Sequence, residues 1–208
     1  MTVKVILADD HVFIRNGVES FLAGSDFEVV AAVGSGAEAL AAIARCDPAI
    51  AILDIRMPDG SGIEVLQAMR ARGDRRPVVL LTADLEDSAL LAALDAGVQG
   101  IVLKVGGESH LIDCLAAVNV GGRWIPDELL AQAERVRAAR ANSPIKRLTP
   151  RETEMARMVA QNMRNRDIAD RFELSEGAVK FALHAVFRKL EVTTRTELAL
   201  LLQRFGND

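Results

Sequence analysis

The sequence predicts an α/β protein with a doubly wound, five-stranded parallel sheet, followed by a small all-helical domain. Short apolar runs alternate with Ala- and Leu-rich stretches of helical spacing over residues 1–125, and capped helices follow them. The net charge is negative in the N-terminal part of the chain and positive in the C-terminal part. Residues 1–125 carry 10 Lys and Arg against 17 Asp and Glu, whereas residues 146–208 carry 12 against 9. We expect two domains with different partners, of which the basic one is a candidate for binding nucleic acid.

Five apolar, mostly β-branched runs predict the strands, at residues 3–7, 29–33, 50–53, 78–81 and 101–103. Helical spacing predicts a helix after each strand, at residues 12–23, 36–45, 62–71, 86–96 and 107–120. Parallel strands need helical crossovers and are buried on both faces, which accounts for the continuous apolar runs. A sheet of this kind binds its ligand beyond the carboxyl ends of the strands.

Polar side chains stand at four of those carboxyl ends: Asp9 and Asp10, Asp54, Thr82 and Lys104. Each one alone is most simply a helix cap or a loop residue. Together they would place three mutually repelling carboxylates in one crevice, so we expect a cation to hold them. Oxygen ligands suit Mg²⁺. The hydroxyl and the ammonium beside it are donors suited to an incoming phosphoryl group.

The C-terminal part has the pattern of a helix-turn-helix. Thr149, Pro150 and Glu152 form a capping box with proline at the first helical position. A short helix over residues 166–172 follows, and Ser175 then caps a longer helix. A short helix, a tight turn and a longer helix are typical of this motif.

The longer helix carries polar residues away from its apolar face. At about 100° per residue, Lys180, His184 and Arg188 lie about 100–180° from Val179, which begins the apolar stripe. A solvated face would give the same pattern. Phe181, however, lies at about 200°, opposite the core, where a phenyl ring needs a cover such as a thymine methyl group or a protein partner.

The composition indicates a globular protein without a membrane segment. Of the 208 residues, 50% are apolar and 26% are charged. No apolar run approaches the roughly 20 residues that cross a bilayer, and the start becomes acidic too soon for a secretory signal. Cys46 and Cys114 are far apart in the sequence, and each lies in a stretch with helical spacing. This pattern favours small core residues of a protein in a reducing compartment. We therefore expect a cytoplasmic protein with no membrane partner.

The residues at the strand ends resemble those of the receiver domain of bacterial response regulators, a flavodoxin-like fold. The resemblance rests on the residues already named and on Met57-Pro58, Gly60, Gly62 and Ala83. The stretches "ADDHVFIRNGVESFL" and "GSGAEAL" resemble the NarL/FixJ subfamily more narrowly. The match covers residues 1–122.

The resemblance implies a role for each residue of this site. Asp54 would accept a phosphoryl group from a sensor histidine kinase. Mg²⁺ would be held by Asp9, Asp10, Asp54 and the backbone carbonyl of Arg56. Thr82 and Lys104 would bind the phosphoryl oxygens. One position differs from the pattern of the family. Receivers usually carry Tyr or Phe where this chain has Ile101, and that aromatic ring swings inward when the Thr engages phosphate. An aliphatic side chain cannot make this movement.

The C-terminal part resembles the LuxR-type DNA-binding domain through "LTPRETEM", "NRDIADRF", "LSEGAVK", "RKLEV" and "TRTEL". The resemblance implies base contacts by Lys180, Phe181 and His184, with Lys180 and Arg188 near phosphates. Ala178 and Ala182 replace the usual Thr and His, which removes polar groups that could meet the DNA backbone.

The last helix is the expected dimer surface. Over residues 195–205, Leu200 points away from the apolar stripe, with Thr196 and Gln203 beside it. A single exposed leucine is ordinary. The resembling family pairs through this helix, and weak contacts per monomer would make pairing on two half-sites more important.

Between the two domains, residues 126–147 predict a helix followed by a flexible joint at residues 142–144. The predicted boundaries are therefore 1–122 for the receiver, 123–145 for the linker and 146–208 for the DNA-binding domain.

The resemblances together imply a two-component response regulator and not an enzyme. Phosphorylation of Asp54 would control homodimerisation and binding to double-stranded promoter DNA. Two alternatives stay open. With Ile101 in place of the aromatic residue, the receiver could be a phosphorylation-independent protein-interaction module. A Mg²⁺-dependent phosphatase of the haloacid dehalogenase type also uses a strand-end Asp, but it has a DxD pattern, and the second residue after Asp54 is Arg56.

Overall fold

The structure, a computed structural model, describes residues 2–104 and 108–205. The chain divides into two compact units, Met1–Ala133 and Glu134–Asp208. The first residue of the predicted helix at 107–120 and the last three of the predicted domain at 146–208 lie outside the described residues.

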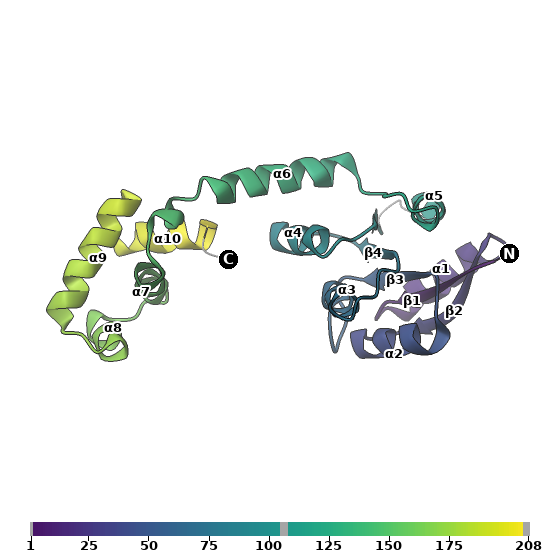
Figure 1. The fold of residues 1–208 in the computed structure, drawn as a ribbon, viewed down its shortest axis with the longest axis horizontal. Coiled ribbons are helices and arrows are strands. Elements are labelled where there is room, and N and C mark those ends of the chain that lie inside the picture. The colour runs from purple at the N-terminus through teal and green to yellow at the C-terminus, as the bar shows by residue number, and fades with distance from the viewer. Residues whose placement is uncertain (1, 105–107, 206–208) are drawn as a thin grey trace. The chain divides into compact units, whose positions relative to one another are not determined.

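The first unit contains a five-stranded parallel sheet with the strand order β2-β1-β3-β4-β5 (Figure 1). The strands are β1 (Val3–Ala8), β2 (Phe27–Val33), β3 (Ile50–Asp54), β4 (Val78–Thr82) and β5 (Gly100–Leu103). The direction of strand addition reverses between β1 and β3, and a doubly wound sheet opens a crevice at this point. The predicted fold class is thus confirmed.

The helices that follow the five strands lie where the sequence predicts them, and their ends, where the structure describes them, differ from the prediction by one residue or none. They are α1 (Val12–Leu22), α2 (Gly36–Cys46), α3 (Gly62–Ala71), α4 (Asp87–Asp95) and α5 (Glu108–Asn119). Ser35 and Ser61 cap α2 and α3 by accepting hydrogen bonds from the backbone amides of Glu38 and Glu64. Such caps satisfy amides that the first helical turn leaves unpaired.

All five strands are longer than predicted, and β1 and β5 each include one further residue, Ala8 and Gly100. β2 begins two residues earlier, at Phe27, because this buried side chain already pairs with Val3 of β1. β3 and β4 each include one further residue, Asp54 and Thr82, which pair with Leu81 and Leu103 of the neighbouring strands. The two side chains of the predicted site therefore stand on the sheet itself and share its rigidity.

The second unit is helical. Its core is formed by α7 (Pro150–Ala160), α8 (Asn165–Phe172), α9 (Glu176–Leu190) and α10 (Arg195–Phe205). The predicted apolar stripe of the longer helix is buried, with Val179, Leu183, Val186 and Leu190 at most 4% exposed. The capping box of Thr149 and Glu152 is also present.

The connection between the units begins with α6 (Asp127–Ala141), and the boundary between the units falls inside this helix. The flexible joint at residues 142–144 stays a prediction, and regular structure resumes at its last residue. Residues Pro144–Arg147 form a 3₁₀ helix, η1, which Ser143 caps through the amide of Ile145. Ile145 is partly buried against the helical core, and this contact contributes to the stability of η1.

Within the described ranges, no helix combines the length and the apolar character that a membrane span requires.

Candidate functional site

The carboxylates of the predicted site lie together at the carboxyl edge of the sheet. The ligand atoms of Asp9, Asp10, His11 and Asp54 all lie within 4.8 Å of one another. Asp9 is fully buried and Asp54 is 4% exposed, whereas Asp10 and His11 face solvent. We call Asp9, Asp10, Asp54, Thr82 and Lys104 the acidic crevice.

Lys104 is the cation of the acidic crevice. Its Nζ lies 2.7 Å from Asp9 Oδ2 and 2.9 Å from Asp54 Oδ1. Asp9 Oδ2 is nevertheless buried without a well-aligned hydrogen bond. One ammonium thus faces three carboxylates, two of them buried, and a buried carboxylate is costly unless it is fully compensated. The residues fit a divalent cation, because all three carboxylates offer hard oxygen ligands.

Burial and the neighbouring charges shift the pKa values of Asp54 and Lys104. Burial raises the pKa of Asp54 above its ordinary value, the hydrogen bond from Lys104 opposes that shift, and the charges of Asp9 and Asp10 add to it. Burial alone would lower the pKa of Lys104, but its pairing with the carboxylates of Asp9 and Asp54 outweighs that effect and raises the pKa. Lys104 therefore stays charged at neutral pH.

Thr82 belongs to the crevice by position, but its hydroxyl is engaged with the next loop. It is 3% exposed, donates to the carbonyl of Asp84 and accepts from the amide of Asp84 at 3.2 Å. Arg56, whose carbonyl was expected near a metal, is an exposed residue after β3. Ile101 is fully buried in β5, pairs with Leu80 and donates its amide to the carbonyl of Trp124.

Three contacts around the crevice were not foreseen from the sequence. A Cβ on Gly36 would lie 2.1 Å from the carbonyl oxygen of Gly60, so the loop after β3 touches the first turn of α2 backbone to backbone. The Gly36 amide also donates to the carbonyl of Pro58 at 3.0 Å. His11 Nδ1 lies 2.6 Å from Asp10 Oδ1. The two glycine motifs were visible in the sequence, but no local signal pairs them.

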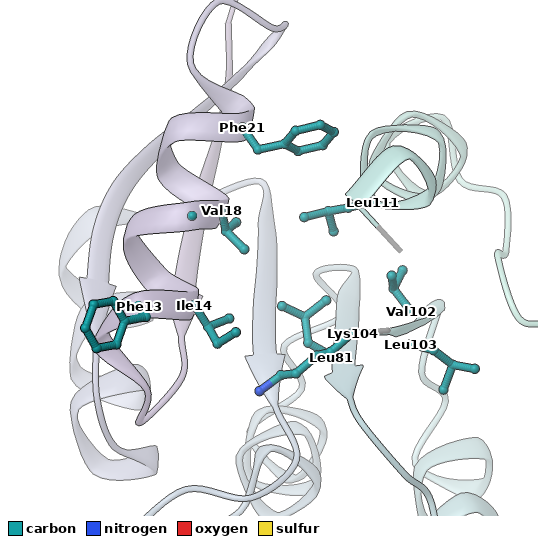
Figure 2. A pocket seen from close by; sticks show the side chains of 10 residues that line it. Phe13, Ile14, Val18, Phe21, Leu81, Val102, Leu103, Lys104 and Leu111 are labelled. Carbon is teal, nitrogen blue, oxygen red and sulfur yellow. The ribbon is translucent and has the colours of Figure 1, made fainter. Parts of the chain in front are cut away.

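An apolar cavity of about 150 Å³ lies beside Lys104, between α1 and the ends of β4 and β5. Figure 2 shows Ile14, Val18 and Phe21 on one side, and Leu81 and Leu111 on the other. These apolar side chains lie along one flank of the Lys104 stem, which agrees with the effect of burial on its pKa. Phe13, at the edge of the cavity, is 90% exposed.

In the second unit, the predicted DNA-binding residues lie on the outer face of α9. Lys180, His184 and Arg188 are exposed, and Phe181 is 80% exposed. Lys180, Phe181 and His184 line an open groove together with Arg195, the first residue of α10. The Arg195 guanidinium donates to Asn165 and to the carbonyl of Met163, so it is held in place beside the groove.

The predicted dimer residues lie on the outer face of α10. Leu200 is 60% exposed, with Thr196 and Gln203 exposed near it, while Leu198 and Leu202 on the other face are buried.

Comparisons with known proteins identify the family of both domains. The family model for the response regulator receiver domain matches residues 5–116, and the model for the luxR family of bacterial regulatory proteins matches residues 146–202. The DNA-binding transcriptional activator DevR/DosR of Mycobacterium tuberculosis is 33% identical over 95% of this chain and 93% of its own length. The response regulator VraR of Staphylococcus aureus is 31% identical over 96% of both chains.

Solved structures give the same result. RcsB of Salmonella typhimurium matches with a TM-score of 0.70 and 26% identity, over 97% of this chain and 100% of that chain. A complex of RcsB with DNA matches with a TM-score of 0.63 and 25% identity, over 98% and 99% of the two chains. The chain therefore belongs to the response regulators, and it joins an N-terminal receiver domain to a C-terminal DNA-binding domain of the LuxR type.

Proposed function

We propose that Asp54 accepts a phosphoryl group from a sensor histidine kinase and that this modification controls binding of the C-terminal domain to promoter DNA. The observation that carries the proposal is the acidic crevice, where a rigid strand presents a buried carboxylate beside Lys104. A nucleophile on a strand end has fixed support behind it and open access in front.

In the transfer, a carboxylate oxygen of Asp54 bonds to phosphorus, the phosphorus–nitrogen bond to the kinase histidine breaks, and the imidazole leaves. Lys104 is 2.9 Å from Asp54 and offers a charge-assisted hydrogen bond to the phosphoryl oxygens. Asp9, Asp10, Asp54 and the carbonyl of Arg56 would hold Mg²⁺, which would screen the negative charges that the two partners bring together.

The second half of the proposal concerns DNA. Lys180, Phe181 and His184 would contact base edges in the major groove, and Lys180 and Arg188 would lie near phosphates. The exposed residues Thr196, Leu200 and Gln203 would pair two protomers on two half-sites. The DNA complex of RcsB supports this assignment by its likeness over 98% of the chain.

The direct test is mass spectrometry after incubation with acetyl phosphate and Mg²⁺. We expect one phosphoryl group on the wild type, none on Asp54→Ala, and slower uptake by Asp10→Ala because metal binding is weakened. Chelation of Mg²⁺ should stop uptake. Full phosphorylation of Asp54→Ala would place the nucleophile elsewhere. A wild type that takes up no phosphoryl group would favour a phosphorylation-independent interaction module.

A further inference from the structure

We propose that His11 is a further ligand of the metal site in the acidic crevice, and that its imidazole raises the affinity of this site for transition-metal dications such as Co²⁺ relative to Mg²⁺. This inference rests on the metal-binding part of the proposed function, and it does not depend on phosphoryl transfer. It names the residue that sets the metal preference of the site.

His11 is the N-cap residue of α1, but its side chain does not cap that helix. The backbone is extended there, as is usual for an N-cap residue, yet the imidazole makes no hydrogen bond to the first turn. The backbone amide of His11 donates to Asp9 Oδ1 at 2.9 Å, which fixes the residue beside the crevice. The imidazole is therefore available to the crevice and not committed to the helix.

The imidazole lies against the two carboxylates that precede it in the chain. His11 Nδ1 is 2.6 Å from Asp10 Oδ1 and 3.3 Å from Asp9 Oδ1. The ligand atoms of these three residues and of Asp54 all lie within 4.8 Å of one another. Metal bonds of about 2 Å allow two ligands of one ion to lie up to about 4 Å apart. The exposed side chains of Asp10 and His11 can close the remaining difference.

Lys104 compensates the carboxylates of the crevice only in part. Its ammonium pairs with Asp9 and Asp54. Asp9 is fully buried, yet its Oδ2 has no well-aligned hydrogen bond. Among the described residues, the ion-pair partner of the Asp10 carboxylate is His11, and a neutral imidazole leaves that charge uncompensated. A dication compensates both carboxylates, and a neutral imidazole is one of the commonest metal ligands.

The type of ligand decides which dication gains from His11. Mg²⁺ prefers oxygen ligands and keeps several of its waters, so an imidazole nitrogen adds little to its binding. Imidazole suits transition metals such as Ni²⁺ and Zn²⁺, and affinity rises from Mn²⁺ through Co²⁺ to Ni²⁺ at a given site. Because carboxylates alone also follow this order, the contribution of His11 is the change in the ratio of the two affinities when the imidazole is removed.

The test is calorimetric titration of the full chain with Co²⁺ and, separately, with Mg²⁺, without any phosphoryl donor. His11→Asn is the variant of choice, because asparagine is a favoured N-cap residue and the start of α1 is kept. We expect His11→Asn to lower the Co²⁺ affinity by about 10- to 100-fold and to change the Mg²⁺ affinity by less than about 2-fold. Its thermal midpoint without metal should equal that of the wild type.

His110→Asn is the matched control, because His110 is an exposed histidine on α5. It should bind both metals as the wild type does. A second measurement separates a ligand from a residue that only orients Asp10. The ring protons of a histidine bound to paramagnetic Co²⁺ shift far outside the ordinary proton range, so the Co²⁺ form should show such signals in the wild type and in His110→Asn, and His11→Asn should lack them.

Three outcomes would contradict the inference. Equal losses of Co²⁺ and Mg²⁺ affinity in His11→Asn would mean that His11 only positions Asp10. Unchanged affinities, or shifted ring protons that persist in His11→Asn, would place Co²⁺ on other groups. Each of these results leaves the proposed function intact as long as the wild type binds Mg²⁺. A wild type that binds neither cation would remove the metal from the proposed function and the inference with it.

Discussion

The two units of this protein place their polar side chains in opposite ways. Among the described residues, the first unit buries Asp9, Asp54 and Thr82 at one edge of its sheet. The helical core of the second unit is apolar, and its candidate contacts, Phe181 among them, face outward. Chemistry on a carboxylate benefits from removal of water, whereas recognition of DNA needs an exposed surface.

This difference has an energetic consequence. Buried carboxylates reduce the stability of the fold unless they are paired, so the first unit is strained where it functions. The exposed side chains of the second unit contribute little to its stability and can be changed without unfolding it. Substitutions around the acidic crevice should therefore affect stability, whereas substitutions on the exposed faces of α9 and α10 should affect binding alone.

The largest effect is expected for Leu200→Asp in the second unit. A charge on the outer face of α10 should prevent pairing and leave the fold intact, because Leu200 is 60% exposed. Loss of linked binding should weaken affinity for a two-half-site duplex by about 100-fold or more. The measurement is a binding titration with a duplex selected from random DNA by the wild type.

Val120→Asp is the matched control for Leu200→Asp, since Val120 is 83% exposed and directly follows α5 in the other unit. It should bind the same duplex as the wild type does. If Leu200→Asp also binds as tightly as the wild type, the protomers pair through another surface.

The next largest effect is expected for Gly36→Ala in the first unit. The added Cβ would lie 2.1 Å from the Gly60 carbonyl, and both backbones must shift to accommodate it. Overpacking of this kind costs about 1–3 kcal/mol. The thermal midpoint should fall, and Mg²⁺ affinity should fall with it, because the loop carrying Arg56 is displaced.

Gly34→Ala is the control for Gly36→Ala in the same turn. Its nearest neighbour would be the flexible Arg15 guanidinium, at 3.4 Å, so the change should be tolerated. If both variants keep the wild-type midpoint and Mg²⁺ affinity, the contact between the two glycine motifs does not position the loop.

Much of the fold could be predicted because its signals are local. The apolar runs predicted the strands. Asp54 and Thr82 were predicted at strand ends because each one directly follows such a run. The contact of Gly36 with Gly60 and the bond from Thr82 to Asp84 could not be predicted, since each depends on the path of a loop in three dimensions. The 3₁₀ helix at Pro144 was also missed, because it depends on the packing of Ile145 against the helical core.

A smaller effect, confined to DNA binding, is expected for the outer face of α9. Phe181→Ala should change sequence preference at one base pair by about 1–3 kcal/mol. Lys180→Ala should weaken binding to all sequences and reduce the salt dependence by about one counterion. Both variants should keep the wild-type thermal midpoint, because both side chains are exposed. Selection from random DNA and titrations at several salt concentrations measure the two effects, and a Phe181→Ala variant with unchanged selection would remove Phe181 from the DNA surface.

The smallest effect is expected for Asp54→Asn, and it should be a gain of stability. Because burial raises the pKa of Asp54, the folded protein binds this proton more tightly than the unfolded chain does. Stability therefore falls as the pH rises from the unfolded pKa through the raised folded pKa, and it stays lower above that value. Asparagine has no such proton, so without Mg²⁺ at neutral pH the variant should unfold at a higher temperature than the wild type.

The gain should be of the order of 1 kcal/mol. Two close charges at an effective dielectric of 20 interact by about 4 kcal/mol, so removal of the Asp54 charge relieves repulsion from the other carboxylates by a similar amount. The lost attraction between Asp54 and Lys104 offsets most of this relief. The gain should vanish at a pH below the ordinary Asp pKa, and Mg²⁺ should stabilise the wild type more than the variant. Asp113→Asn, an exposed acid on α5, should show neither effect. A variant less stable than the wild type without Mg²⁺ would mean that Lys104 fully compensates the buried carboxylates, and the two units would then not differ in strain.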